Sequence, residues 1–159
     1  ALKILNPDVN VVFLDAEESP WEGEGAKWFR QWVQSSYNSY NSKQYREVEY
    51  IVNLEMVGIG GKNIVISDYT NDLSAMIKQS FNPVVMQLPP NDSWFFKGRF
   101  DTVCMSTFPR INGRNSFKHF KKAHTVGDNL KSIRIDDMDE FVTDVLLPLS
   151  KTEIVMQVN

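Results

Sequence analysis

Two adjacent glutamates, Glu17 and Glu18, follow the apolar run Val11-Val12-Phe13-Leu14. This run is typical of a strand buried on both faces, so both carboxylates are expected at its carboxyl end, where open α/β sheets bind their ligands. Adjacent side chains that leave a strand point to opposite sides, so one glutamate can coordinate a metal while its neighbour handles the proton of a metal-bound water. The pair alone is more typical of a solvated acidic loop.

Two downstream segments supply further groups of the same chemistry. Glu55 lies near the end of the strand-like run 48–57, which is rich in β-branched residues and is followed by glycines. His124 stands just before Thr, Gly, Asp and Asn residues that favour a tight turn and a helix start. Carboxylate oxygens and imidazole nitrogens are the usual ligands of a catalytic zinc, which keeps one position open for water. The Glu, Glu, His set therefore predicts a zinc site.

Other polar residues have simpler interpretations. Asp15 is expected to cap local backbone amides, although it could orient a metal ligand. His119 lies five residues before His124, a separation that does not place two side chains on one helical face. Asp92 is a candidate N-cap of a short helix. Cys104 lies in the apolar run 101–106, where it is expected to fill the core, and as the single cysteine it has no partner for an intrachain disulfide.

The elements that must position these residues alternate between strands and helices. Apolar residues at helical spacing predict helices over 24–35, from a cap at Asn71 or Asp72 through Ser80, and over 136–147, where Pro148 is expected to end the helix. Apolar runs predict strands over 63–67 and 101–107, and an extended segment through Met86. This order predicts a three-layer α/β/α sandwich around a twisted, mostly parallel mixed sheet.

Composition places the chain in the globular class. Its 159 residues, of which 42% are hydrophobic, are enough for one domain over 1–159 with a buried core. A net charge of −3 argues against a nucleic-acid surface. No run of about 18 apolar residues is present, and no basic start precedes an apolar run, so we expect neither a membrane span nor a signal peptide in this sequence.

Four sequence blocks in order resemble the motifs of the zinc aminopeptidase and glutaminyl cyclase family of metallohydrolases. The blocks are 13–18, 53–58, 92–98 and 124–130. The resemblance implies that Glu17 is the general base and that Asp92 faces the substrate. It also implies that one or two zinc ions are bound by Glu18, Glu55 and His124.

The function implied by the resemblance is removal of N-terminal residues from peptides. Metal-activated water would attack the peptide carbonyl of a peptide or small amide substrate, and Glu17 would pass the proton to the leaving amine. Two alternatives stay open: a glutaminyl-cyclase-like aminoacyl transferase, and a noncatalytic binding or structural module derived from the same fold. The chain departs from the family at Glu55, where Asp is usual, at Ser93, where His is usual, and at Ala123, where Tyr is usual.

The family's earlier His-x-Asp motif has no counterpart in this sequence. The chain therefore resembles the C-terminal portion of the catalytic domain, with the N-terminal part of that domain missing. We expect the chain alone to have little or no activity, and an oligomer or partner to cover the place of the missing strands. The resemblance also implies a secreted or periplasmic location.

Overall fold

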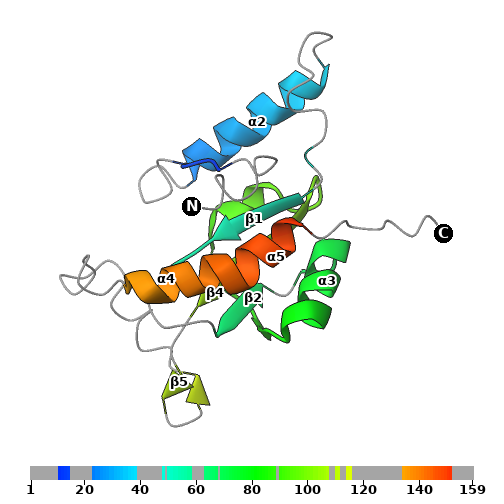
Figure 1. The fold of residues 1–159 in the computed structure, drawn as a ribbon. Coiled ribbons are helices and arrows are strands. Elements are labelled where there is room, and N and C mark those ends of the chain that lie inside the picture. The colour runs from blue at the N-terminus through cyan, green and yellow to red at the C-terminus, as the bar shows by residue number, and fades with distance from the viewer. Residues whose placement is uncertain are drawn as a thin grey trace.

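The computed structural model describes residues 11–14, 23–38, 48, 50–58, 63–67, 69–88, 90–107, 110–111, 114–115 and 134–151. Figure 1 shows how the elements of these segments are arranged. In chain order they are α2 (Glu24–Asn38), β1 (Tyr50–Leu54), β2 (Ile64–Ser67), α3 (Asp72–Phe81), β3 (Val84–Met86), the 3-10 helix η2 (Asp92–Phe95), β4 (Asp101–Thr107), β5 (Arg110–Ile111), β6 (Arg114–Asn115), α4 (Ile135–Phe141), the π-helical turn η5 (Val142–Leu146) and α5 (Leu147–Ser150).

The main sheet has four strands in the order β1-β4-β2-β3. β1 runs parallel to β4, with Tyr50 opposite Asp101 and Leu54 opposite Met105. β2 runs parallel to β3 and antiparallel to β4. The sheet is therefore mixed and mostly parallel, and together with its helices it confirms the predicted α/β class. β5 and β6 form a separate two-stranded sheet.

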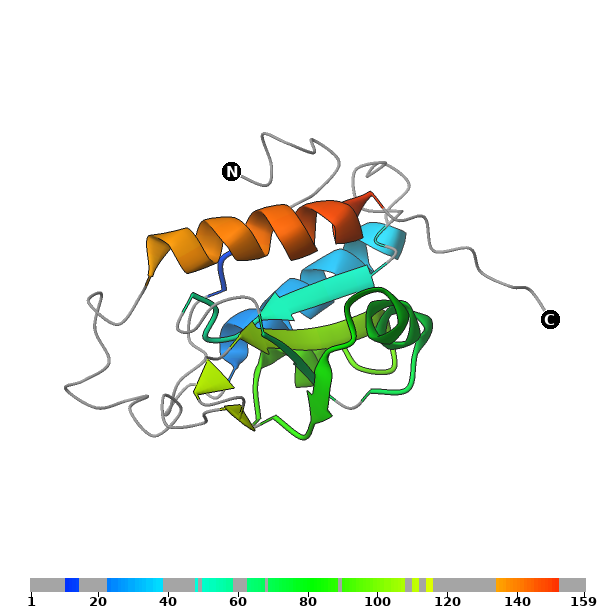
Figure 2. The ribbon, with the colours of Figure 1, turned by 60° about the horizontal axis from the view of Figure 1, so that its bottom comes forward.

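One face of the sheet is apolar and carries the main core. Alternate residues of β2 and β4 pack against α3 and against the continuous helical segment from α4 to α5. The buried members of this core are Ile64, Ile66, Leu73, Ile77, Val103, Met105, Phe141, Val145, Leu146 and Leu149. Figure 2 shows the α4 to α5 segment lying across this face. The helices bury their apolar stripes here, as strand and helix periodicity require.

The opposite face of the sheet carries buried polar side chains beside a second, smaller apolar cluster that contains Val65, Leu88 and Cys104. On β4 the residues that alternate with Val103 and Met105 are Thr102, Cys104 and Ser106, all buried. Ser67 crosses from β2 to β4: its Oγ accepts a hydrogen bond from the Cys104 N–H at 2.9 Å and donates one to the Cys104 carbonyl oxygen at 3.4 Å. η2 contacts both β1 and β4. This second layer therefore combines buried polar groups with a short helix.

Helix α2 joins the molecule through η2. Figure 1 shows α2 beyond β1, and the Phe29 and Phe96 rings meet edge to face with centroids 6.0 Å apart. Arg30 Nη1 donates to the carbonyl oxygen of Phe95 at 3.3 Å. Gly23, which precedes α2, has a φ of +75° and lies so close to the Phe95 ring that a Cβ there would come within 2.2 Å of it. Aromatic contact and a glycine of left-handed conformation thus fix α2 against η2.

Several local predictions are confirmed. Asn71 caps α3, its Oδ1 accepting from the N–H of Ser74 at 2.8 Å, and Glu55 directly follows β1. The predicted strand over 101–107 is β4. In the described part of the chain, no helix has both the length and the apolarity needed to cross a membrane.

Two local predictions are wrong. Residues 11–14 form no strand, and Phe13 is 94% exposed. An apolar run makes a strand only where a neighbouring strand accepts its hydrogen bonds, and none of the described strands pairs with these residues. Pro148 does not end the last helix, because α5 continues through it to Ser150. The π-helical turn before it bonds the Leu147 N–H to the carbonyl oxygen of Val142, five residues back. That wider turn accommodates the proline ring, which a regular α-helix would reject.

Candidate functional site

Glu55 stands at the carboxyl end of β1 in a tightly determined turn. Its backbone N–H continues the β1 to β4 ladder by donating to the Met105 carbonyl oxygen at 2.9 Å. The next residue, Met56, has a φ of +51°, and Gly58 has a φ of +85°. The Gly58 N–H donates to Thr107 Oγ1 at 3.2 Å. A left-handed methionine is unfavourable and persists only when its surroundings enforce it, a situation that is concentrated at functional sites.

Asp92 lies in η2 with its carboxyl group buried. Asp92 is only 8% exposed, and its Oδ1 atom has no hydrogen-bond partner among the described residues. Burial raises the pKa of this carboxyl group above its ordinary value, because water no longer stabilises the charged form. Asn91, and not Asp92, is the N-cap of η2, since its Oδ1 accepts from the Ser93 N–H at 3.0 Å. The Asp92 side chain therefore has no capping duty.

Cys104 shows that the two carboxylates occupy one neighbourhood. The pKa of its thiol is raised to about 12, mainly by burial; a hydrogen bond from Asn53 opposes the rise, and the negative charges of Glu55 and Asp92 contribute to it. Both carboxylates thus act on the same buried sulfur, from the end of β1 and from η2. A thiol with so high a pKa is not a nucleophile at neutral pH. Its predicted role as a core residue is confirmed by its complete burial.

A set of neutral polar side chains surrounds Asp92, and sequence reasoning missed it. Asn91 Oδ1 accepts from Ser93 Oγ at 2.5 Å and from Asn53 Nδ2 at 3.3 Å. Tyr69 and Ser93 hydroxyl oxygens are 2.8 Å apart. The signal available in the sequence was the alternation of Thr102, Cys104 and Ser106 along β4, which predicts one polar face on that strand.

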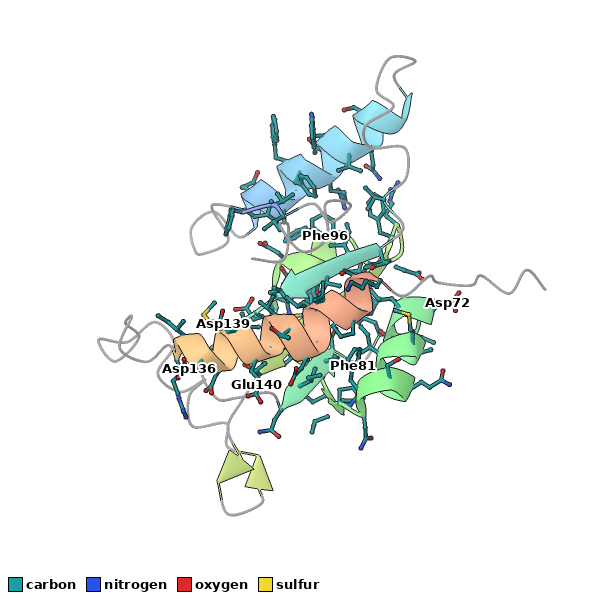
Figure 3. All side chains as sticks on the ribbon, in the orientation of Figure 1. Asp72, Phe81, Phe96, Asp136, Asp139 and Glu140 are labelled. Atoms are coloured by element: carbon teal, nitrogen blue, oxygen red, sulfur yellow. The ribbon has the colours of Figure 1, made fainter. Side chains whose placement is uncertain are left out.

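The five predicted site residues divide into two groups. Glu55 and Asp92 are described, and the hydrogen bond from Asn53 to Asn91 joins the two segments that contain them. Glu17, Glu18 and His124 lie outside the described residues. Figure 3 labels three other acidic residues, Asp136, Asp139 and Glu140, on α4. The same view places Phe96 between α2 and β1.

The described part of the chain contains only one of the predicted zinc ligands. Within the described ranges no group of three or more His, Cys, Asp or Glu residues could hold a metal ion. Glu55 is the one predicted ligand among them, and its half-buried carboxylate follows a strand end beside a second carboxylate. Carboxylate oxygen is a regular ligand of zinc, and a cation would offset the negative charge gathered there.

Comparison with known proteins identifies the family. The sequence profile of Peptidase family M28 matches residues 2–147 of the chain. Searches of curated proteins and of solved structures give no significant match. The match extends over nearly the whole chain and agrees with the four blocks that resemble the zinc aminopeptidase and glutaminyl cyclase family. The chain therefore belongs to Peptidase family M28, with the metallopeptidase-like character of that family.

Proposed function

We propose that the protein is a zinc-dependent aminopeptidase-like hydrolase that removes N-terminal residues from peptides. The observation that carries the proposal is the buried carboxyl group of Asp92, one oxygen of which has no hydrogen-bond partner in the described part of the chain. A buried acceptor without a partner costs about 1–3 kcal/mol, so its retention favours a ligand that supplies the missing donor. Membership in Peptidase family M28 supports a peptide as that ligand.

The free amino terminus of a peptide is the donor that suits Asp92. An ammonium group brings a positive charge and three N–H donors to a carboxylate, and charge-assisted bonds of this kind are stronger than neutral ones. Because a hydrogen bond from Asn53 to Asn91 joins the segment of Asp92 to that of Glu55, the amino end of the substrate would be held near the metal ligands. This arrangement selects the first peptide bond for cleavage, which is the definition of an aminopeptidase.

Glu17 would move the proton in this reaction. It accepts a proton from the attacking water and delivers it to the leaving amine, as general acid–base catalysis requires. Glu18, Glu55 and His124 would hold the zinc, which when bound supplies a Lewis acid that polarises the carbonyl group.

The test compares two peptides that differ only in the amino terminus. With zinc added, the protein should cleave a leucyl peptide and leave its N-acetylated form intact. Asp92→Asn should raise KM for the free peptide about tenfold or more, the effect of losing a charge-assisted hydrogen bond. Asp139→Asn, an exposed carboxylate on α4, is the matched control and should change nothing.

Other outcomes identify the alternatives. Equal cleavage of the acetylated peptide would contradict recognition of an amino terminus. Release of ammonia from an N-terminal glutaminyl peptide, without peptide cleavage, would identify the aminoacyl transferase. Tight peptide binding without turnover would favour the noncatalytic module.

A further inference from the structure

We infer that Tyr69, Ser93, Asn91 and Asn53 form a positioning network that holds Asp92 ready for the amino group of the substrate. The inference rests on the proposed function and adds four residues to it. None of the four occupies a predicted metal-ligand or base position. They come from β1, from the segment after β2, and from the start of η2.

The direction of each hydrogen bond in the network follows from proton counting. Ser93 Oγ has one proton and gives it to Asn91 Oδ1, so in the contact with Tyr69 the tyrosine hydroxyl must be the donor. Asn53 Nδ2 also donates to Asn91 Oδ1, at 3.3 Å, and lies 3.7 Å from Cys104 Sγ. The hydrogen bonds therefore run from Tyr69 through Ser93 to Asn91 Oδ1, which also accepts the bond from Asn53 of β1.

The side-chain amide oxygen of Asn91, Oδ1, is the centre of the network. It receives the Ser93 N–H at 3.0 Å in addition to the two side-chain donors. Its three bonds close the first turn of η2 and tie that turn to Asn53 on β1. Ser93 is completely buried, and Asn91 is 6% exposed, so water does not compete for these bonds.

Asp92 lies between the two central members of the network but takes no bond from either. Asn91 and Ser93, its chain neighbours, are both fixed, so the position of the Asp92 backbone is fixed as well. A buried carboxylate without a partner would gain energy by turning toward water. The network prevents the first turn of η2 from opening in that direction. Since a displacement of 1 Å at a binding group can reduce the rate about 100-fold, rigidity at Asp92 has a functional consequence.

The experiment removes single hydroxyl groups from the network. Tyr69→Phe deletes one hydrogen bond of the network and Ser93→Ala deletes two, and each variant should raise KM for the leucyl peptide about fivefold or more with kcat changed less than twofold. The controls are Tyr50→Phe, whose hydroxyl donates to Leu149 at the other sheet face, and Ser106→Ala, whose buried Oγ has no hydrogen-bond partner among the described residues. Both controls should keep the KM of the parent protein.

A second arm separates positioning from simple stabilisation. In an Asp92→Asn background, Tyr69→Phe should have no further effect on KM, because the group that it positions has lost its charge. The same KM increase in both backgrounds, or an equal loss of kcat, would overturn the inference and leave a structural role.

Calorimetric binding of alaninamide, a minimal amide with a free ammonium group, distinguishes failure of the inference from failure of the function. Binding that weakens about fivefold in Tyr69→Phe, in a protein that does not hydrolyse peptides, would contradict the proposed function and support the network. Alaninamide binding that is absent from the parent protein, or equal in parent and variant, would overturn the inference.

Discussion

The Asp92 carboxyl group is held in a state that does not favour folding. Burial raises its pKa, so the folded protein binds its proton more tightly than the unfolded chain does. Stability therefore falls as the pH rises from below the ordinary aspartate pKa of 3.8 through the raised value. Folding by itself therefore gives no reason to keep such a residue. Binding a positively charged group of a substrate gives such a reason, because that charge stabilises the carboxylate.

Asp92→Asn should make the protein more stable at neutral pH. The amide has a similar shape and no charge, so the variant should gain about 1 kcal/mol at pH 7. For a domain of this size that is a rise in Tm of roughly 2–4 °C. Well below pH 3.8 the aspartate is protonated in both states and the gain should vanish. Thermal melts of the parent, Asp92→Asn and the exposed control Asp139→Asn at about pH 2.5 and pH 7 measure this gain. A gain of equal size at both pH values would show that the carboxylate charge is not its source.

Glu17→Gln should abolish hydrolysis without removing the metal. The amide cannot accept a proton, and general-base catalysis contributes about 10² to 10⁴ in rate. Zinc content after dialysis should equal that of the parent protein, whereas His124→Ala should lose zinc. Turnover above half of the parent's would show that Glu17 is not the base. Equal zinc in the His124 variant would remove that residue from the metal site.

Sequence patterns located the charged residues of the site but not the residues that support them. Glu55 is predicted because a carboxylate after a strand is a local signal, whereas the family resemblance singles out Asp92, whose local signal predicts only a helix cap. Tyr69 and Asn53 meet the start of η2 from positions 24 and 38 residues away from their partners. No periodicity within one element reports such a contact. The neutral polar residues could therefore be identified only once the strands were placed side by side.

At the scale of elements, predictions succeeded where short-range physics decides. Asn71 was a predicted cap, and it both caps α3 and donates to the Thr102 carbonyl oxygen at 2.8 Å. Pro148 misled because its effect depends on the preceding turn, which is π-helical. The strand prediction for the apolar run at residues 11–14 failed for another reason. A strand requires a partner strand, and the hydrophobicity of a segment does not identify that partner.

Gly23→Ala should test the contact between α2 and η2. The substitution puts a Cβ within 2.2 Å of the Phe95 ring and forces alanine into a φ of +75°. Strain and overpacking together should lower the free energy of unfolding by about 2–4 kcal/mol. Gly98→Ala is the matched control: its φ is +77°, but nothing lies within 4 Å of its Cβ position, so it should lose only about 1 kcal/mol. Chemical denaturation of both variants measures the difference, and equal losses would show that the Phe95 contact adds nothing.

At the scale of the molecule, the two faces of the sheet differ in the residues that they bury. The face that packs against α3 and the α4 to α5 segment contains the large apolar core. The face toward η2 contains buried hydroxyl, amide, thiol and carboxyl groups. The α/β class and most strands could be predicted, because apolar runs identify buried strands. The antiparallel pairing of β2 with β4 and the polar character of the second face could not, since both depend on strand order.

The edge of this sheet leads to the last prediction, which concerns the whole catalytic domain. β1, the strand that ends at Glu55, is an outer strand of the described sheet, paired with β4 alone within it. Open edges accept further strands, and the family resemblance implies a His-x-Asp pair upstream of the first glutamate block. We expect the 159-residue chain to cleave aminoacyl-nitroanilide substrates only weakly with zinc present, and an upstream extension of its reading frame to increase cleavage strongly.

Size-exclusion chromatography of both forms measures whether a second copy covers the β1 edge when the extension is absent. Strong zinc-dependent cleavage by the short chain would show that Glu17, Glu18, Glu55 and His124 suffice without an upstream pair. Inactivity of both forms, with native folding, would instead favour a binding module. Activity only in the extended form would assign the upstream segment a direct part in the metal site, because β1 and its turn already place Glu55 by backbone hydrogen bonds that do not involve it.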